Sequence, residues 1–139
     1  MSIDFYGLNE VLDMLDKPVE PQTVDKALNK ACLVVERSAR QKAQEIKDTG
    51  ALSRSIKHEV KNHEGIIYTP LEYAPYVEYG TGLFAENGGR TDVPWNYKDD
   101  EGEWHSTSGQ KPQPFMRPAL DENREEILRV LKEGILSND

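Results

Sequence analysis

The sequence predicts an α+β fold: a small antiparallel sheet with a long helix from the N-terminal half and a C-terminal amphipathic helix packed on one face. Three observations predict it. Apolar residues recur every three or four positions over residues 24–46, and again over 114–135, as on the buried face of a helix. Between these segments, two short apolar runs at 56–60 and 66–68 flank a turn signal, as in a hairpin. The length of 139 residues fits one domain over residues 1–139.

Residues 1–20 are expected to form a helical extension at the start of the chain. Leu8, Val11, Leu12 and Leu15 recur at helical spacing, and this short amphipathic helix is expected to end before Pro18. Residues 18–21 then interrupt the pattern. The long helix is expected to begin after them, with Thr23 as its N-cap.

The long helix is predicted from a regular apolar stripe and ends at a glycine. Asp48 and Thr49 precede Gly50, which suits the left-handed position after a helix. Residues 49–56 are expected to be a tight connection to the sheet. The stripe consists of Val24, Leu28, Ala31, Val35, Ala39, Ala43 and Ile46, and the opposite face carries Lys26, Lys30, Arg37, Arg40 and Lys47.

The middle of the chain predicts a hairpin and then a short helix. The hairpin has its turn at residues 62–65. Residues 72–79 are expected to be helical, with Pro75 in the first turn and Gly80 closing the helix. Tyr73, Tyr76 and Tyr79 then lie on one side of this helix.

Residues 82–113 predict a long arm, rich in glycine and polar residues, that contains a second hairpin. Its strands are expected at 95–98 and 103–106, because aromatic residues flank a turn signal at 99–102. The arm is too aromatic for a disordered linker. Its aromatic side chains either pack on their own sheet or form a contact surface, and the sequence leaves both open. The last helix is expected to begin at Pro114, with Met116, Leu120, Ile127, Leu131 and Ile135 on one face.

Composition argues against several classes of protein. The net charge of −8 is unlike that of a protein that coats nucleic acid. No run approaches 18 apolar residues and the start of the chain lacks the blocks of a signal peptide, so a cytoplasmic product without a membrane partner is expected. No histidine spacing suggests a metal site, and no catalytic or phosphate-binding motif appears, so we expect no enzymatic activity and no cofactor. Cys32 is expected to be a small core side chain.

The basic residues are concentrated in residues 21–60, whereas the rest of the chain is acidic. This segment is expected to pair with acidic residues, within one subunit or across a subunit boundary. The alternative is a small DNA-binding module that uses the basic helix 24–47.

Three segments in fixed order resemble the neck or head–tail joining proteins of long-tailed double-stranded DNA phages. The long helix before them, the hairpin at 95–104 and the helix after them fit the same resemblance, which covers residues 21–135. The segments are Thr49-Gly50-Ala51-Leu52-Ser53-Arg54-Ser55-Ile56, Tyr73-Ala74-Pro75-Tyr76-Val77-Glu78-Tyr79-Gly80-Thr81, and Gly109-Gln110-Lys111-Pro112-Gln113-Pro114-Phe115-Met116-Arg117-Pro118-Ala119-Leu120.

The resemblance implies a structural virion protein of the head–tail interface, made in the cytoplasm of the host bacterium. Such a head–tail connector forms a homo-oligomeric ring, expected to be a hexamer or dodecamer, and joins the portal assembly to the tail. Its partners are other connector and tail proteins, and double-stranded DNA passes through its channel without sequence-specific binding. A tail-terminator, or tail-completion, ring that caps the tail tube is the alternative. The residues expected to make contacts are Arg37, Arg40, Tyr76, Tyr79, Trp95, Tyr97, Trp104 and Phe115.

Overall fold

The computed structural model describes residues 1–4, 19–46, 50–86, 88–89 and 92–136. These residues belong to two units: residues 1–71 together with 115–139, and residues 72–114. The predicted helix over residues 8–15 lies outside the described residues, as do Lys47, Asp48 and Thr49. The α+β class is confirmed, with helices against a small antiparallel sheet.

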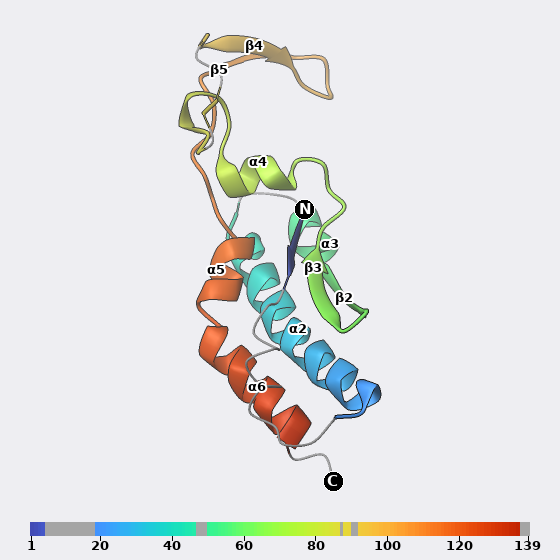
Figure 1. Ribbon diagram of the computed structural model, residues 1–139. Helices are drawn as coiled ribbons and strands as arrows, with labels where there is room; N and C mark the ends of the chain where they lie inside the picture. Colours follow the sequence, from blue (N-terminus) through green and yellow to red (C-terminus); the bar gives the residue numbers. More distant parts are fainter. Residues whose placement is uncertain (5–18, 47–49, 87, 90–91, 137–139) are drawn as a thin grey trace. The chain divides into compact units, whose positions relative to one another are not determined.

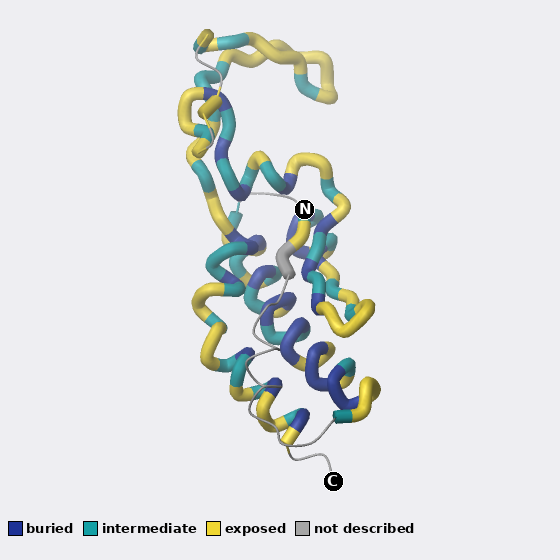
Figure 2. Tube along the Cα trace, in the orientation of Figure 1, coloured by how far each residue is buried: buried dark blue, intermediate teal, exposed yellow. Residues whose placement is uncertain are grey.

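Helix α2 (Pro21–Gln44) is the centre of the first unit. It packs against the sheet through β2 and β3, and also against α6. Figure 1 shows α6 running alongside α2, with the strands on another side of it. Figure 2 shows that buried positions follow α2 along most of its length, as the apolar stripe predicted. The buried residues are Thr23, Val24, Ala27, Leu28, Ala31, Cys32, Val35, Glu36, Ala39 and Ala43.

The start of α2 differs from the prediction. The N-cap is Glu20, in an extended conformation, and Pro21 occupies the first turn. Proline suits this place, because its φ is already helical and the N–H that it lacks would have no partner there. Thr23 is therefore not the cap but a buried residue of the first turn, and its N–H donates to the Glu20 carbonyl at 3.0 Å.

The connection after α2 also differs, because it contains a short helix, α3 (Ala51–Ser55). Gly50 has the predicted left-handed conformation, with φ of 86°, but it precedes α3 and does not close α2, whose C-cap is Glu45. Leu52 is fully buried. The hydroxyl of Ser53 donates to the Arg40 carbonyl at 2.9 Å, which fixes α3 to α2. Burial of one apolar side chain and this bond stabilise a helix too short to form alone.

The sheet consists of β1 (Ser2–Asp4), β2 (Lys57–Lys61) and β3 (Glu64–Tyr68), all antiparallel, in the order β1-β3-β2. The predicted hairpin is confirmed, but its turn is only Asn62 and His63. Their φ values are 54° and 61°, and a two-residue turn with both φ values positive matches the twist of the strands. Strand β1 was not predicted, since three residues carry too little pattern; it pairs with the free edge of β3.

The last element is two helices and not the single one predicted: α5 (Met116–Asp121) and α6 (Arg124–Leu136). Asn123 separates them. Its side-chain amide donates to the Ala119 carbonyl at 2.7 Å, and its own carbonyl accepts the Ile127 N–H at 2.8 Å. Ile127, Leu131 and Ile135 of α6 are buried. A Cβ at Gly134 would lie 2.9 Å from the Cβ of Ala27, so α6 approaches α2 very closely there.

The second unit contains α4 (Ala74–Tyr79), the 3-10 turn η1 (Gly82–Phe84), and a hairpin of β4 (Trp95–Lys98) and β5 (Trp104–Thr107). The short helix, with Pro75 in its first turn and Gly80 at its end, is confirmed, and so is the aromatic hairpin. Backbone bonds join the two sides of the arm. The N–H groups of Thr81 and Leu83 donate to the carbonyls of Gln110 and Ser108, each at 2.9 Å.

Cys32 is a core residue, as predicted, and its thiol should be inert in the folded protein. It is fully buried, and burial, aided by the negative charge of Glu36, raises its pKa to about 12. Because only the thiolate is alkylated, iodoacetamide at pH 8 should label native Cys32 at least about a hundredfold more slowly than the urea-unfolded chain. Mass spectrometry over time measures both rates. Equal rates would show that the thiol is accessible in the folded state.

Candidate interaction surfaces

Exposed apolar side chains are concentrated in the second unit. Of the seven large hydrophobic residues that are exposed in the described part of the chain, six lie within residues 72–114. Exposed apolar surface gathered in one region marks an interaction site more often than scattered single residues do. The six are Tyr73, Tyr76, Leu83, Phe84, Tyr97 and Trp104.

The inner face of the β4–β5 hairpin packs on its own unit at Trp95, whereas Tyr97 and His105 on the same face are exposed. The register pairs Trp95 with Thr107 and Tyr97 with His105, so these four residues share one face. The Tyr97 and His105 rings stack with centroids 5.3 Å apart. A Cβ at Gly82 would lie 2.7 Å from the Trp95 ring, so that ring lies directly against Gly82.

The outer face of the hairpin presents Trp104. This residue pairs with Lys98 and shares its face with Asn96 and Ser106. This residue is 69% exposed, the largest value among the large hydrophobic residues in the described part of the chain. The register therefore shows that one hairpin does both things left open by the sequence: it packs through Trp95 and exposes Trp104.

The turn between β4 and β5 is acidic and is held by Asp99. One carboxylate oxygen accepts the N–H groups of Glu101 and Glu103 at 2.9 and 2.8 Å, and the other bonds His105 Nε2 at 2.6 Å. The hydrogen bond with His105 is the main reason that the pKa of Asp99 lies below its usual value, followed by the Glu103 N–H. Asp100, Glu101 and Glu103 are left exposed to solvent.

Asp99, Glu103 and His105 also form a group with metal-ligand chemistry that sequence reasoning missed. One potential ligand atom from each lies within 4.8 Å of the others. Asp99 already bonds the Glu101 and Glu103 N–H groups of the turn and His105 of β5, and Glu103 and His105 are exposed. The arrangement accounts for the shape of the turn without an ion.

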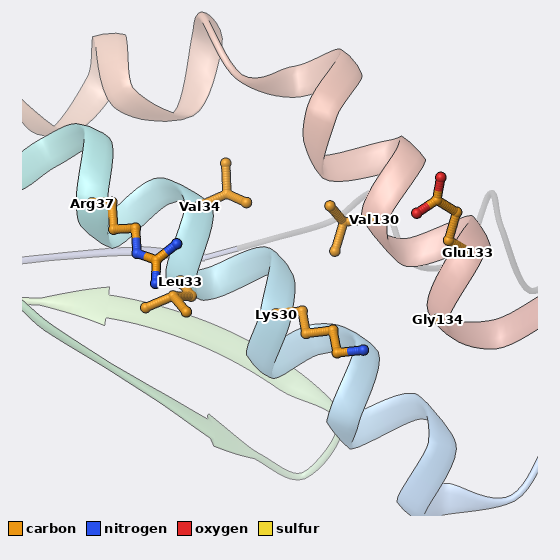
Figure 3. A pocket seen from close by; sticks show the side chains of 7 residues that line it. All are labelled: Lys30, Leu33, Val34, Arg37, Val130, Glu133 and Gly134. Carbon is orange, nitrogen blue, oxygen red and sulfur yellow. The ribbon is translucent and has the colours of Figure 1, made fainter.

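A second candidate surface is the groove between α2 and α6, shown in Figure 3. Its volume is about 490 Å³. Val34 and Val130 point toward one another from the two helices, and Lys30 lies on the α2 side with Glu133 on α6. The groove is lined by Lys30, Leu33, Val34 and Arg37 of α2 and by Val130, Glu133 and Gly134 of α6, and this set is called the α2/α6 groove below.

The α2/α6 groove carries unpaired positive charge. Lys30 and Arg37 are exposed, and neither has an ion-pair partner among the residues that the structure describes. Glu133, in contrast, pairs with Arg129 at 2.7 Å. Leu33, Val34 and Val130 are only half-buried. The groove therefore combines an apolar floor with a basic rim.

Two of the predicted contact residues, Arg40 and Phe115, make contacts within the first unit. Arg40 donates from Nε and Nη2 to the Ile56 carbonyl at 2.9 and 2.7 Å, and its Nη2 lies 3.7 Å from Glu36 Oε1. Phe115 is fully buried, so it packs inside the first unit and offers no surface in this conformation. Arg37, Tyr76, Tyr97 and Trp104 are exposed, whereas Tyr79 and Trp95 are half-buried.

Residues 8–80, more than half of the chain, match the sequence model of a family described as "Bacteriophage HK97-gp10, putative tail-component". The chain belongs to this family. The HK97-gp10-like family comprises tail components from the head–tail region of long-tailed phages, which confirms the resemblance and makes the protein a structural part of the virion. No curated protein and no solved structure matches the chain.

The family match covers the long helix, α3, the first hairpin and α4, and ends at Gly80. The first two motif segments thus lie in or at the edge of the matched region, whereas the aromatic hairpin lies beyond it. Within the described residues of this HK97-gp10-like chain, no helix has the length and apolar content needed to cross a bilayer.

Proposed function

We propose that this phage tail component is a head–tail connector: one domain of residues 1–139 that assembles as a hexameric or dodecameric ring and joins the portal assembly to the tail. The observation that carries the proposal is the concentration of exposed aromatic side chains on residues 72–114. A subunit that works alone in water gains nothing from exposing them. Aromatic residues are enriched where protein surfaces meet.

A closed ring needs two different patches on each subunit, because each contact joins one surface to another surface of the next copy. This chain offers two patches of different chemistry. One is aromatic with an acidic turn, on the arm, and the other is basic and apolar, on α2 and α6. Such a pair supports head-to-tail association over a two-fold dimer.

The net charge of −8 is consistent with DNA passing through such a ring without being held. Negative charge repels phosphate and keeps a duplex mobile during packaging and ejection. The exposed cations Lys26, Lys30 and Arg37 lie together on one helix, and they are the feature that a DNA-binding module would use. If the protein is a connector, these cations contact neighbouring protein subunits and not DNA.

The tail-terminator role is the second candidate, because the family description names a tail component and does not fix its place. Both roles need a ring, but they predict different particles when this protein is absent. A connector joins two finished parts, whereas a terminator stops the growth of the tail tube.

The test is an amber mutation of this gene in the parent phage, followed by electron microscopy of the lysate. We expect DNA-filled heads and free tails of normal length, with whole particles restored by the wild-type gene on a plasmid. Tails of irregular length would assign the terminator role instead. Normal infectious particles would overturn both, and salt-dependent DNA binding by the purified chain would then favour the DNA-binding module.

A further inference from the structure

We infer that the arm tip of one copy docks into the α2/α6 groove of the next copy. The arm tip is defined as Asp100, Glu101, Glu103 and Trp104. This inference rests on the proposed ring and names the surfaces that would close it.

The groove is large enough for an aromatic side chain. Its volume of about 490 Å³ lies within the range of pockets that hold small ligands, roughly 300–1,000 Å³. Leu33, Val34 and Val130 give it an apolar floor that solvent reaches in the free subunit. Trp104 is the most exposed of the large hydrophobic residues that the structure describes, so placing its indole on this floor would bury apolar surface on both sides.

Apart from Lys98, which pairs with Trp104 across the hairpin, and Glu133, which pairs with Arg129, the charges of the two surfaces are opposite. Asp100, Glu101 and Glu103 are exposed, and their carboxylates have no partner among the described residues. Lys30 and Arg37 are exposed and equally unpaired. Opposite potentials on two docking surfaces steer association and reject other partners. An arginine beside a tryptophan face adds a cation–π attraction, for which Arg37 and Trp104 are the pair.

The spacing of the charges also agrees. Lys30 and Arg37 are seven residues apart on one helix, or about 10.5 Å along its axis. Asp100 and Glu103 are three residues apart in the turn and so span at most roughly 10 Å. The two carboxylates are thus no farther apart along the chain than the two cations are along the helix.

The experiment reverses the charges of each surface in the full-length chain. The groove variant is Lys30→Glu with Arg37→Glu, and the tip variant is Asp100→Lys with Glu103→Lys. Sedimentation velocity and electron microscopy measure assembly. We expect each variant alone to associate about thirtyfold more weakly than the wild type or worse, as for loss of an interface hot spot. Trp104→Ala should weaken association similarly.

Combining the changes should restore assembly. In an equimolar mixture, the native tip of the groove variant meets the native groove of the tip variant. The basic tip of the tip variant meets the acidic groove of the groove variant, so rings of alternating subunits form again. A chain that carries all four substitutions should also assemble. Recovery in the mixture shows that each variant is folded. The matched control is Lys57→Glu with Lys61→Glu, which reverses two exposed cations on β2 and should assemble like the wild type.

The same variants are scored in the phage by rescue of the amber mutant, where each should fail alone and the coexpressed pair should succeed. If the wild type assembles and the variants assemble equally well, or if the mixture does not recover, the inference is overturned and the proposed ring stands. If the wild type neither associates nor enters particles, the ring fails, and the inference fails with it.

Discussion

Replacing Phe115 with alanine is expected to lower the free energy of unfolding of the first unit by about 3–5 kcal/mol, as for other buried aromatic residues. Phe115 is fully buried and is the largest of the fully buried side chains. It is the N-cap residue of α5, at the point where the chain returns to the first unit. Removing its ring leaves a cavity that the surrounding backbone cannot close. Urea denaturation followed by circular dichroism at 222 nm measures the loss.

The control is the same change at Phe84, which is exposed, and which should alter stability by less than about 0.5 kcal/mol. The comparison also separates the two roles considered for Phe115. A contact residue would leave the free subunit stable and weaken only its assembly. If Phe115→Ala unfolds like the wild type, burial of Phe115 does not stabilise the free subunit, and its predicted role as a contact residue would be favoured.

The main elements were predictable because their patterns are local. The stripe of small and apolar residues in α2 repeats over six turns, and the aromatic residues of the second hairpin flank a strong turn signal. The elements that were missed depend on distant partners. Strand β1 exists only beside β3, and α3 is held by Leu52 burial and the Ser53 bond to Arg40. The break at Asn123 is held by its side-chain amide, which donates to the Ala119 carbonyl, and by backbone bonds on either side.

The candidate surfaces were predictable only in part, for the same reason. The sequence predicted Trp104 and Arg37 as contact residues, and both are exposed, but whether they make contacts stays a prediction. It grouped Arg37 with Arg40, whose guanidinium bonds the Ile56 carbonyl. Helical spacing alone does not tell a charged side chain that faces solvent from one that closes a neighbouring turn. The α2/α6 groove was not predicted at all, since it exists only where two segments about a hundred residues apart pack together.

Replacing Gly82 with alanine is expected to disrupt the fold of the arm, at a cost of about 3 kcal/mol or more in its local stability. Gly82 has φ of 61°, which costs a residue with a side chain roughly 1–2 kcal/mol. The new Cβ would also lie 2.4 Å from the Ser108 carbonyl oxygen and 2.7 Å from the Trp95 ring. Both neighbours are fixed, because Ser108 accepts the Leu83 N–H and Trp95 belongs to β4.

Hydrogen exchange of the Thr81 and Leu83 amides measures this loss directly, since their bonds join the two sides of the arm. The matched control is Gly102→Ala. Its φ of 85° carries the same backbone strain, but only the end of the flexible Lys98 side chain lies nearby, at 3.5 Å. The control should lose roughly 1–2 kcal/mol, and the difference between the two variants isolates the contact at Gly82. Equal exchange rates in both would mean that Trp95 does not pack against Gly82, and that the inner face of the hairpin is free for other contacts.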